Sequence, residues 1–375
     1  MPRKVVFVIN DLGLSGAPLY MEAIIKRLKD VDKDVDITVI ANYDGIIENN
    51  LLNYCSVYIL NKYHLPFAKM NFLRNKLMKW RVFISLMYTR YDNAFFQTSC
   101  VLDFAAKIKA SNKAAFILED KNMFNRCTKL FKSPDKYMSY FSVVIGTNPV
   151  IISFLNNQFG VRAKLVEGFY SEKFNNKMSE KVFKSNGVFQ VGSVGSPSHR
   201  KGFDVFLDIA LMVVQACNNI NFVWLGFTNQ AEIDELYNSI LFGYNERIIL
   251  LMATSVPQDI YLKNDVLFLC SREDPFPHVV IEHAMLGIPT LSMPSGNGHI
   301  DIIKSYNTGF LLESNNKHQI ASFIKELFNN MDDLKRKGEN SFNYYSKYSE
   351  KSQCDKILNF AGLLGLPNDN NFTKI

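Results

Sequence analysis

Short apolar runs alternate with longer, helix-like stretches along the first half of the chain. The runs are KVVFVI, DITVIAN, SVYIL, NAFFQTS, AAFILED and SVVIGT. Continuous apolar runs of this length are typical of parallel strands that are covered on both faces. Because the strands alternate with helices, right-handed βαβ units are favoured, and we predict a doubly wound parallel sheet.

The alternation stops at a polar stretch near residues 164–184, which we interpret as a linker. It resumes with VFQVGSVG, NFVWLG, RIILL, VLFLCS, IPTLSM and TGFLL, and from about residue 320 the pattern is helical only. We therefore predict an α/β protein with two doubly wound, Rossmann-like domains over 1–170 and 171–345, and a helical tail over 346–375. Two such domains would face a cleft, and ligands of these sheets bind outside the carboxyl ends of the strands.

The composition limits the class of protein. The chain has 375 residues, of which 47% are hydrophobic, and a net charge of +6. This is enough apolar material for two cores, and it argues against disorder. Six scattered cysteines without a CxxC pair or a zinc-ligand spacing indicate reduced thiols and a cytoplasmic location. We expect neither a signal peptide nor a transmembrane helix, because the apolar segments that these need are missing from the pattern.

The loop INDLGLSGAPLYM follows the first predicted strand and precedes a helix. Gly13 and Gly16 would let the backbone approach a ligand, and the helix start would offer free N–H groups to an anion. Pro18 suits the first helical turn. The loop is not a GxGxxG motif, so an ordinary strand-to-helix turn remains the alternative.

The loop VGSVGSPSHRKGFDVF also follows a predicted strand. Arg200 and Lys201 lie in this glycine- and serine-rich segment, and Gly202 and Asp204 lead into a helix. Adjacent cations at a helix start strengthen a phosphate site. We favour this interpretation over a solvated basic turn.

The stretch SREDPFPHVVIEHAMLGIPT places two acidic positions around an apolar run. Asp274 comes just after the strand DVLFLC, Pro277 fits a first helical turn, and Glu282 lies about one turn along that helix. Two carboxylates in these positions suit the paired hydroxyl groups of a sugar or a ribose. The alternative is a helix cap together with a solvated glutamate.

Together these loops resemble the retaining, sugar-nucleotide-dependent glycosyltransferases of the GT-B fold called family 4. The resemblance is strongest over residues 185–315 and weaker over 1–170. It rests first on an acidic residue followed by an apolar run, a glutamate and a Gly-x-Pro turn, which together read DPFPHVVIEHAMLGIPT here. It rests also on a lysine–glycine pair, Lys201 and Gly202. The form SREDPFP is similar to bacterial members of this family, whose last helix crosses back onto the first domain.

The resemblance implies a role for each site residue. Asp274, or Glu273 just before it, would hold hydroxyls of the donor sugar, and Glu282 would bind the ribose. Lys201, with Arg200, would neutralise the donor diphosphate. The remaining positions expected at the donor are Gly16, Gly202, Phe276, Pro277, His278 and Val279, with Asp301 and Gly309 matching the family's later glycine-rich turn.

Two positions depart from the family pattern. Ser193 stands where the family often has an arginine, and Arg200 is the expected substitute. The place of the family's histidine at the end of a first-domain strand falls on Leu118, with Glu119 next to it as a candidate polar group. The implied reaction transfers a sugar with retention, and the leaving phosphate itself would take the acceptor's proton.

The expected partners are a nucleotide-diphosphate sugar and a glycan or lipid-linked glycan, with no nucleic acid. Residues 30–36, DVDKDVD, contain DxD patterns but link a helix to a strand, so we interpret them as a solvated turn and expect no cofactor or metal. Residues 49–91 carry seven basic side chains, no acidic ones and several aromatic ones. They fit either an inner-membrane surface or an amphipathic helix of the first domain.

We therefore predict a cytoplasmic enzyme, peripheral on the inner membrane in one interpretation, that acts in bacterial lipopolysaccharide, O-antigen or capsule synthesis. One alternative is a nucleotide-sugar epimerase or hydrolase on the same fold. The other is a catalytically silent protein that binds a glycan or another transferase. The departures at Ser193 and Leu118 favour the silent protein, whereas the intact Lys201, Asp274 and Glu282 argue against it.

Overall fold

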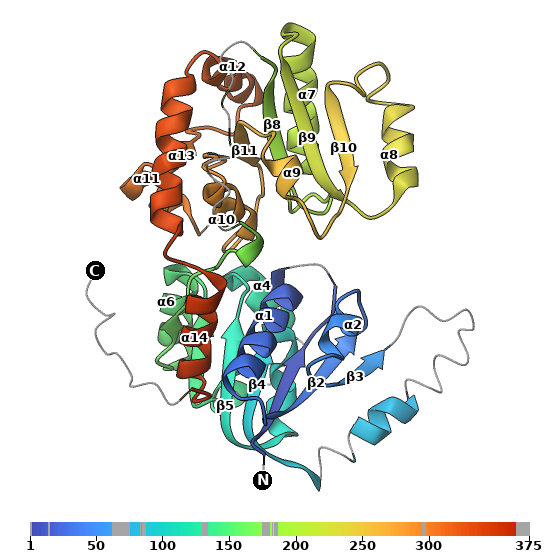
Figure 1. The fold of residues 1–375 in the computed structure, drawn as a ribbon, viewed down its shortest axis with the longest axis vertical. Coiled ribbons are helices and arrows are strands. Elements are labelled where there is room, and N and C mark those ends of the chain that lie inside the picture. Colours follow the sequence, from blue (N-terminus) through green and yellow to red (C-terminus); the bar gives the residue numbers. More distant parts are fainter. Residues whose placement is uncertain are drawn as a thin grey trace. The chain divides into compact units, whose positions relative to one another are not determined.

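The computed structural model describes residues 2–13, 16–61, 76–82, 84, 88–129, 134–174, 181, 183, 187–294 and 298–364. The chain divides into two compact units (Figure 1). The first domain comprises Met1–Glu167 and Glu350–Ile375, and the second comprises Gly168–Ser349. The sequence analysis placed these boundaries a few residues away, at 170/171 and 345/346.

The first domain is built on a seven-stranded parallel sheet with strand order β3-β2-β1-β4-β5-β6-β7. The central strand β1 is buried at every position except Lys4, as a continuous apolar run requires. The strands are β1 Lys4–Ile9, β2 Asp36–Tyr43, β3 Ser56–Asn61, β4 Arg90–Gln97, β5 Lys109–Ile117, β6 Val143–Gly146 and β7 Lys164–Leu165.

Helices connect these strands. They are α1 Gly16–Val31, α2 Glu48–Leu51, the 3-10 helix η1 Ser99–Ala106, α4 Lys121–Thr128, α5 Pro134–Met138, α6 Pro149–Phe159 and, from the end of the chain, α14 Glu350–Phe360. Local sequence explains their ends. Asn148 caps α6 by accepting the amide of Ile151, Pro149 occupies its first turn, and Gly160 ends it in the left-handed conformation.

The helical tail packs on the first domain. Helix α14 lies against α1, where the Arg27 guanidinium donates two hydrogen bonds to the Asp355 carboxylate at 2.6 and 2.9 Å. Both side chains are about one quarter exposed, so water screens this pair only in part. Ile357 and Leu358 add fully buried apolar groups to the same helix. The tail is therefore part of the first domain's core.

The second domain repeats the architecture with a six-stranded parallel sheet of order β10-β9-β8-β11-β12-β13. One core cluster of this domain contains Trp224 and a group of phenylalanines, with 5.0 Å between the ring centroids of Phe206 and Trp224. The strands are β8 Phe189–Val194, β9 Ile220–Phe227, β10 Ile248–Met252, β11 Val266–Leu269, β12 Thr290–Ser292 and β13 Gly309–Leu311.

The helices of the second domain cover both faces of its sheet (Figure 1). They are η2 Glu172–Phe174, α7 Phe203–Ala216, α8 Gln230–Tyr237, α9 Gln258–Tyr261, α10 His278–Met285, α11 Ile300–Tyr306, α12 Lys317–Phe328 and α13 Met331–Tyr345. The strand order reverses between β8 and β11 in this domain, and between β1 and β4 in the first. Ligands of doubly wound sheets bind at such reversal points, outside the carboxyl ends of the strands.

Two further sequence features have a place in the first domain. The DVDKDVD segment joins α1 to β2, and Asp32 pairs there with Arg3 at 2.8 Å. Part of the basic stretch falls outside the described residues, including Lys62, Lys69 and Arg74. Within the stretch, residues 76–82 are helical and expose Trp80. Among the described residues no helix is long and apolar enough to cross a membrane.

The packing of α14 gives a stability prediction. Leu358→Ala removes a fully buried side chain, so we expect the free energy of unfolding of the first domain to fall by about 2–4 kcal/mol. The exposed Lys351 on the same helix provides the control, since Lys351→Ala should change it by less than about 0.5 kcal/mol. Urea unfolding would measure both, and equal midpoints would show that α14 does not stabilise the domain.

Candidate functional site

Two loops meet where the strand order of the second domain reverses. One runs from β8 to α7 and the other from β11 to α10. They meet closely at Gly202, which has φ +75° and whose added Cβ would lie only 2.1 Å from the carbonyl oxygen of Cys270. Only glycine accommodates both the backbone conformation and this approach.

Arg272 fastens the two loops together. Its backbone amide donates to the Arg200 carbonyl at 2.9 Å, and its guanidinium donates to the His199 carbonyl at 2.6 Å. The same guanidinium binds both carboxylate oxygens of Asp204 at 2.8 and 2.7 Å, and this pair lowers the pKa of Asp204. In return, Arg200 donates to the Glu273 carbonyl at 2.9 Å. The sequence analysis assigned no role to Arg272.

Lys201 and Asp274 form the centre of this arrangement. The Lys201 ammonium donates to Asp274 Oδ2 at 2.5 Å, and the two side chains are only 18% and 9% exposed. The two residues come from different loops, 73 positions apart in the sequence. An ammonium group has three N–H donors, so Asp274 fixes Lys201 while leaving it capacity to bind an anion.

Two histidines lie close enough to Asp274 to interact with its charge. Burial lowers the pKa of His278 and of His299 to about 4, although Asp274 acts in the opposite direction on both. Both rings are therefore neutral at physiological pH. The His278 ring is also hydrogen-bonded to the Phe169 carbonyl. Within the described part of the chain, both ring nitrogens of His299 are buried without a hydrogen-bond partner.

Glu282 lies one turn further along α10, with different partners. His278 and Glu282 are four residues apart, so they share one face of the helix. Burial raises the pKa of Glu282 to about 7, while a hydrogen bond from the Tyr261 hydroxyl and the charge of Lys173 lower it. Lys173 also donates to the Ser255 carbonyl at 3.2 Å, which connects this group to the loop after β10.

A buried polar chain beneath α10 fixes the helix. His283 bonds through Nδ1 to the Val279 carbonyl at 2.7 Å and through Nε2 to the Asn264 amide at 3.1 Å. Its ring stacks on Tyr261 with 4.1 Å between centroids. An added Cβ at Gly192 would lie 2.1 Å from Asn264, so β8 needs a glycine there. This support holds the ring of Tyr261, and hence its hydroxyl, at Glu282.

The other predicted residues of the second domain lie on the β11–α10 segment or further along the chain. Phe276 is half-buried against Gly168, whose added Cβ would meet its ring at 2.7 Å. Pro277 is the residue before α10, and Val279 is the second residue of that helix. Asp301 lies in the first turn of α11, two residues after His299.

Ser193, at the position of the family's arginine, is buried in β8. Its hydroxyl donates to the Phe268 carbonyl of β11 at 2.5 Å. The side chain therefore holds two strands together beneath the site.

The predicted residues of the first domain are Gly16 and Glu119. Gly16 is the first residue of α1, so this helix begins two residues before Pro18. Near it, the buried Gln97 at the end of β4 donates to the Ala17 carbonyl at 2.8 Å. Glu119 follows β5 and is 4% exposed; its carboxylate accepts from the amide and the hydroxyl of Ser99. Burial raises the pKa of Glu119.

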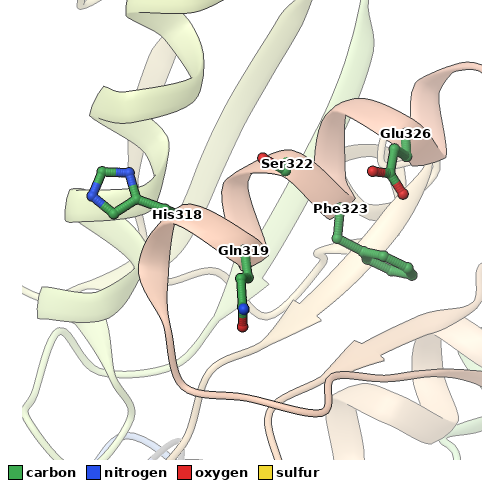
Figure 2. A pocket seen from close by; sticks show the side chains of 5 residues that line it. All are labelled: His318, Gln319, Ser322, Phe323 and Glu326. Atoms are coloured by element: carbon green, nitrogen blue, oxygen red, sulfur yellow. The ribbon is translucent and has the colours of Figure 1, made fainter.

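A pocket elsewhere on the second domain belongs to one helix. Figure 2 shows the five described side chains that line the pocket, all of them on α12. None of the predicted site residues is among these five. Catalytic sites usually combine polar groups from several elements. The lining residues are His318, Gln319, Ser322, Phe323 and Glu326.

The chain is similar in sequence and in fold to several known glycosyltransferases. Residues 174–344 match the family model described as Glycosyl transferases group 1. The capsular polysaccharide biosynthesis glycosyltransferase CapM of Staphylococcus aureus is 28% identical over 167 residues, which cover 43% of each protein. The uncharacterized glycosyltransferase MJ1178 of Methanocaldococcus jannaschii is 24% identical over 348 residues, covering 90% of this chain and 91% of that protein.

A solved structure shares the complete architecture. Anabaena HepE, determined in complex with UDP and glucose, superposes with a TM-score of 0.74 at 16% identity, covering 96% of this chain and all of that one. The chain therefore has the GT-B architecture of two doubly wound domains, as the sequence predicted.

The environment of Glu282 gives a prediction about pH. A buried carboxyl with a pKa of about 7 disfavours ionisation relative to the unfolded chain, where glutamate titrates near pH ~4.3. The cost of ionising Glu282 in the folded protein is absent below about pH 4 and grows as the pH rises to about 7. Above about pH 7 the folded protein bears the full cost. We therefore expect Glu282→Gln to stabilise the ligand-free protein by about 1–2 kcal/mol at pH 8.

Thermal unfolding at pH 5 and pH 8 would test this expectation, with exposed Glu235→Gln on α8 as the control. The gain from Glu282→Gln should shrink toward pH 5. An equal gain at both pH values, or a loss at pH 8, would contradict the assigned environment.

Proposed function

We propose that the protein transfers a sugar, with retention, from a nucleotide-diphosphate sugar to a glycan or lipid-linked glycan. The observation that carries the proposal is the Lys201–Asp274 pair at the strand reversal of the second domain. It sets one cation and one carboxylate side by side where doubly wound sheets bind their ligands. A diphosphate and a hydroxyl-bearing sugar need these two groups.

Lys201 acts on the leaving group. Breaking the bond between sugar and diphosphate builds negative charge on the phosphate oxygens, and an ammonium already held in place stabilises that charge without reorganisation. Asp274 holds the ammonium at 2.5 Å. Arg200 adds a second cation on the same loop, and the N-terminus of α10 adds backbone amides.

Asp274 also acts on the sugar. A carboxylate accepts several hydrogen bonds, so one oxygen can bind Lys201 while the group accepts sugar hydroxyls. The neutral rings of His278 and His299 border it and supply donors and acceptors without adding charge. The leaving phosphate takes the acceptor's proton in this mechanism, which therefore needs no side-chain base.

Glu282 binds the ribose. It lies on the face of α10 that also carries His278, and its interaction with Lys173 points to the loop after β10 as its surroundings. An ionised carboxylate accepts from two adjacent hydroxyls, as the cis-diol of a ribose offers. The loop around Ser255 is then the place where the base is selected.

The relatives support a role in the synthesis of surface polysaccharides. CapM is named for capsular polysaccharide biosynthesis, and the HepE structures contain UDP, glucose or UDP-glucose. We propose that this protein builds a bacterial surface polysaccharide, such as a capsule, an O-antigen or lipopolysaccharide. It would work in the cytoplasm or peripherally at the inner membrane, where lipid-linked acceptors are found.

An assay of donor consumption separates this function from the alternatives. The purified protein is incubated with a panel of nucleotide sugars, with and without bacterial lipid extract, and released nucleoside diphosphate is measured. Release that depends on one donor and on lipid supports the transferase. Release without lipid supports the epimerase or hydrolase. If no donor is consumed by the folded protein and none shifts its melting temperature, a silent binding protein is favoured.

Variants test the site assignment. Lys201→Ala removes the group that stabilises the leaving diphosphate, and Glu282→Ala removes the ribose contact, so we expect each to lower turnover by at least about tenfold. Exposed Lys263→Ala and Glu235→Ala are matched controls in the same domain and should retain turnover. Near-normal turnover in both site variants, with intact far-ultraviolet circular dichroism, would refute the assignment.

The donor site should work without a divalent cation, because Lys201, Arg200 and helix N-termini supply the positive charge. We expect the affinity for the nucleoside diphosphate, measured by isothermal titration calorimetry, to change less than about twofold when EDTA replaces Mg²⁺. A loss of tenfold or more that added Mg²⁺ restores would show that a metal carries the diphosphate.

A further inference from the structure

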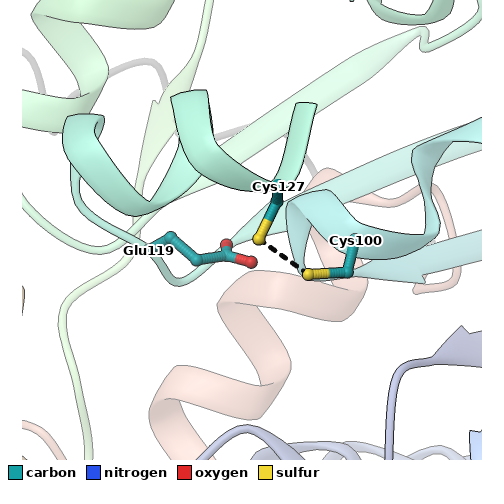
Figure 3. Close-up of side chains that lie close together, drawn as sticks. All are labelled: Cys100, Glu119 and Cys127. Carbon is teal, nitrogen blue, oxygen red and sulfur yellow. Dashed lines mark hydrogen bonds between the residues drawn. The ribbon is translucent and has the colours of Figure 1, made fainter. Parts of the chain in front are cut away.

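The first domain brings together three potential metal ligands that are far apart in the sequence. Cys100 lies on η1, Cys127 lies on α4, and Glu119 precedes α4. The two sulfur atoms are 2.8 Å apart, and ligand atoms of all three residues lie within 4.8 Å of one another. Figure 3 shows the two thiols pointing toward each other with the carboxylate of Glu119 beside them.

The two thiols are hydrogen-bonded to each other. Cys100 donates its S–H to the Cys127 sulfur. Cysteine binds metals as the thiolate, so a cation that binds here takes the place of the S–H protons.

Glu119 is held in place beside the sulfurs. Its Oε1 accepts from the Ser99 amide at 2.7 Å and from the Ser99 hydroxyl at 2.9 Å, and its Oε2 accepts from the Leu118 amide at 3.1 Å. These bonds fix the carboxylate as outer hydrogen bonds fix metal-binding carboxylates elsewhere. Since a carboxylate oxygen has two lone pairs, Oε2 keeps capacity for another ligand.

Two thiols and a buried carboxyl group lie next to each other, with Glu119 only 4% exposed. Metal binding requires such ligands in their deprotonated forms, and the cation compensates the negative charge that results. Both cysteines are half-buried, so an ion can reach them from solvent.

We propose that Cys100, Glu119 and Cys127 bind a thiophilic divalent cation, with zinc as the best match. Two sulfur ligands select a soft or borderline metal, and a carboxylate oxygen is compatible with zinc but unlike the all-oxygen sets of magnesium or calcium. The ion displaces the thiol protons, which are released to water, and its bond lengths require the sulfurs to separate to roughly 3.8 Å. Three protein ligands leave a fourth position for water.

The site would link the segments that follow β4 and β5. It belongs to the first domain, whereas Lys201 and Asp274 belong to the second. The ion therefore fastens η1 to α4, and it engages Glu119 as a ligand. Cys100 and Cys127 are 27 positions apart, so no local spacing in the sequence indicates this site.

Cobalt titration of the full-length protein provides the test. The protein is stripped of metal, reduced and kept anaerobic, and Co²⁺ is added while thiolate-to-cobalt absorption is recorded. We expect one equivalent to bind with that absorption and Zn²⁺ to displace it. Cys100→Ser and Cys127→Ser should each weaken binding at least about tenfold, and Glu119→Gln by a smaller factor. Half-buried Cys217→Ser is the control and should bind normally.

A second measurement avoids variants that fail to fold. One equivalent of Zn²⁺ should protect Cys100 and Cys127 of the unaltered protein from alkylation, as read by peptide mass spectrometry, while Cys217 reacts as before. Equal alkylation with and without Zn²⁺, or cobalt absorption that persists in both cysteine variants, would overturn the proposal. So would a reduced protein that binds no metal but forms a Cys100–Cys127 disulfide in air, which would mark a redox pair.

Discussion

The close approach of Gly202 to the carbonyl of Cys270 is the constraint on which the candidate site depends. A Cβ at this position would lie 2.1 Å from that oxygen, so the β8–α7 loop reaches the end of β11 only with a glycine. The approach allows the backbone of Arg272 to bond to Arg200 and brings Lys201 to Asp274. Two loops, one carrying Lys201 and the other carrying Asp274, thereby become a single site with a fixed geometry.

The fold followed from the sequence because its strands are continuous apolar runs, and β1 and β11 are buried almost throughout. Lys201 and Asp274 were predicted because both lie in loops that follow apolar strands and match the motifs of the family resemblance. Their direct pairing was not predicted, since the two residues lie 73 positions apart in the sequence. His299 and Arg272 were missed for the same reason: neither forms a local pattern, and their positions become meaningful only when the loops dock.

Several buried polar groups of the site lower the stability of the folded domain. Lys201 and Asp274 are largely removed from water, and a buried ion pair regains its desolvation cost only with good geometry. His299 keeps two buried ring nitrogens without partners within the described chain. Such groups are expected where a ligand completes the hydrogen bonding. The supporting layer is different, because Asn264 and His283 satisfy one another and hold α10 rigid.

The shifted carboxyl of Glu282 has a thermodynamic consequence. A group with a pKa of about 7 is a mixture of two protonation states in a neutral solution. If ribose hydroxyls select its ionised form, each nucleotide that binds expels a fraction of a proton into the buffer. The heat of binding would then include the buffer's own ionisation heat, and the apparent affinity would weaken by up to about tenfold per pH unit on the acid side. The nucleotide and the proton would compete for the same oxygen atoms.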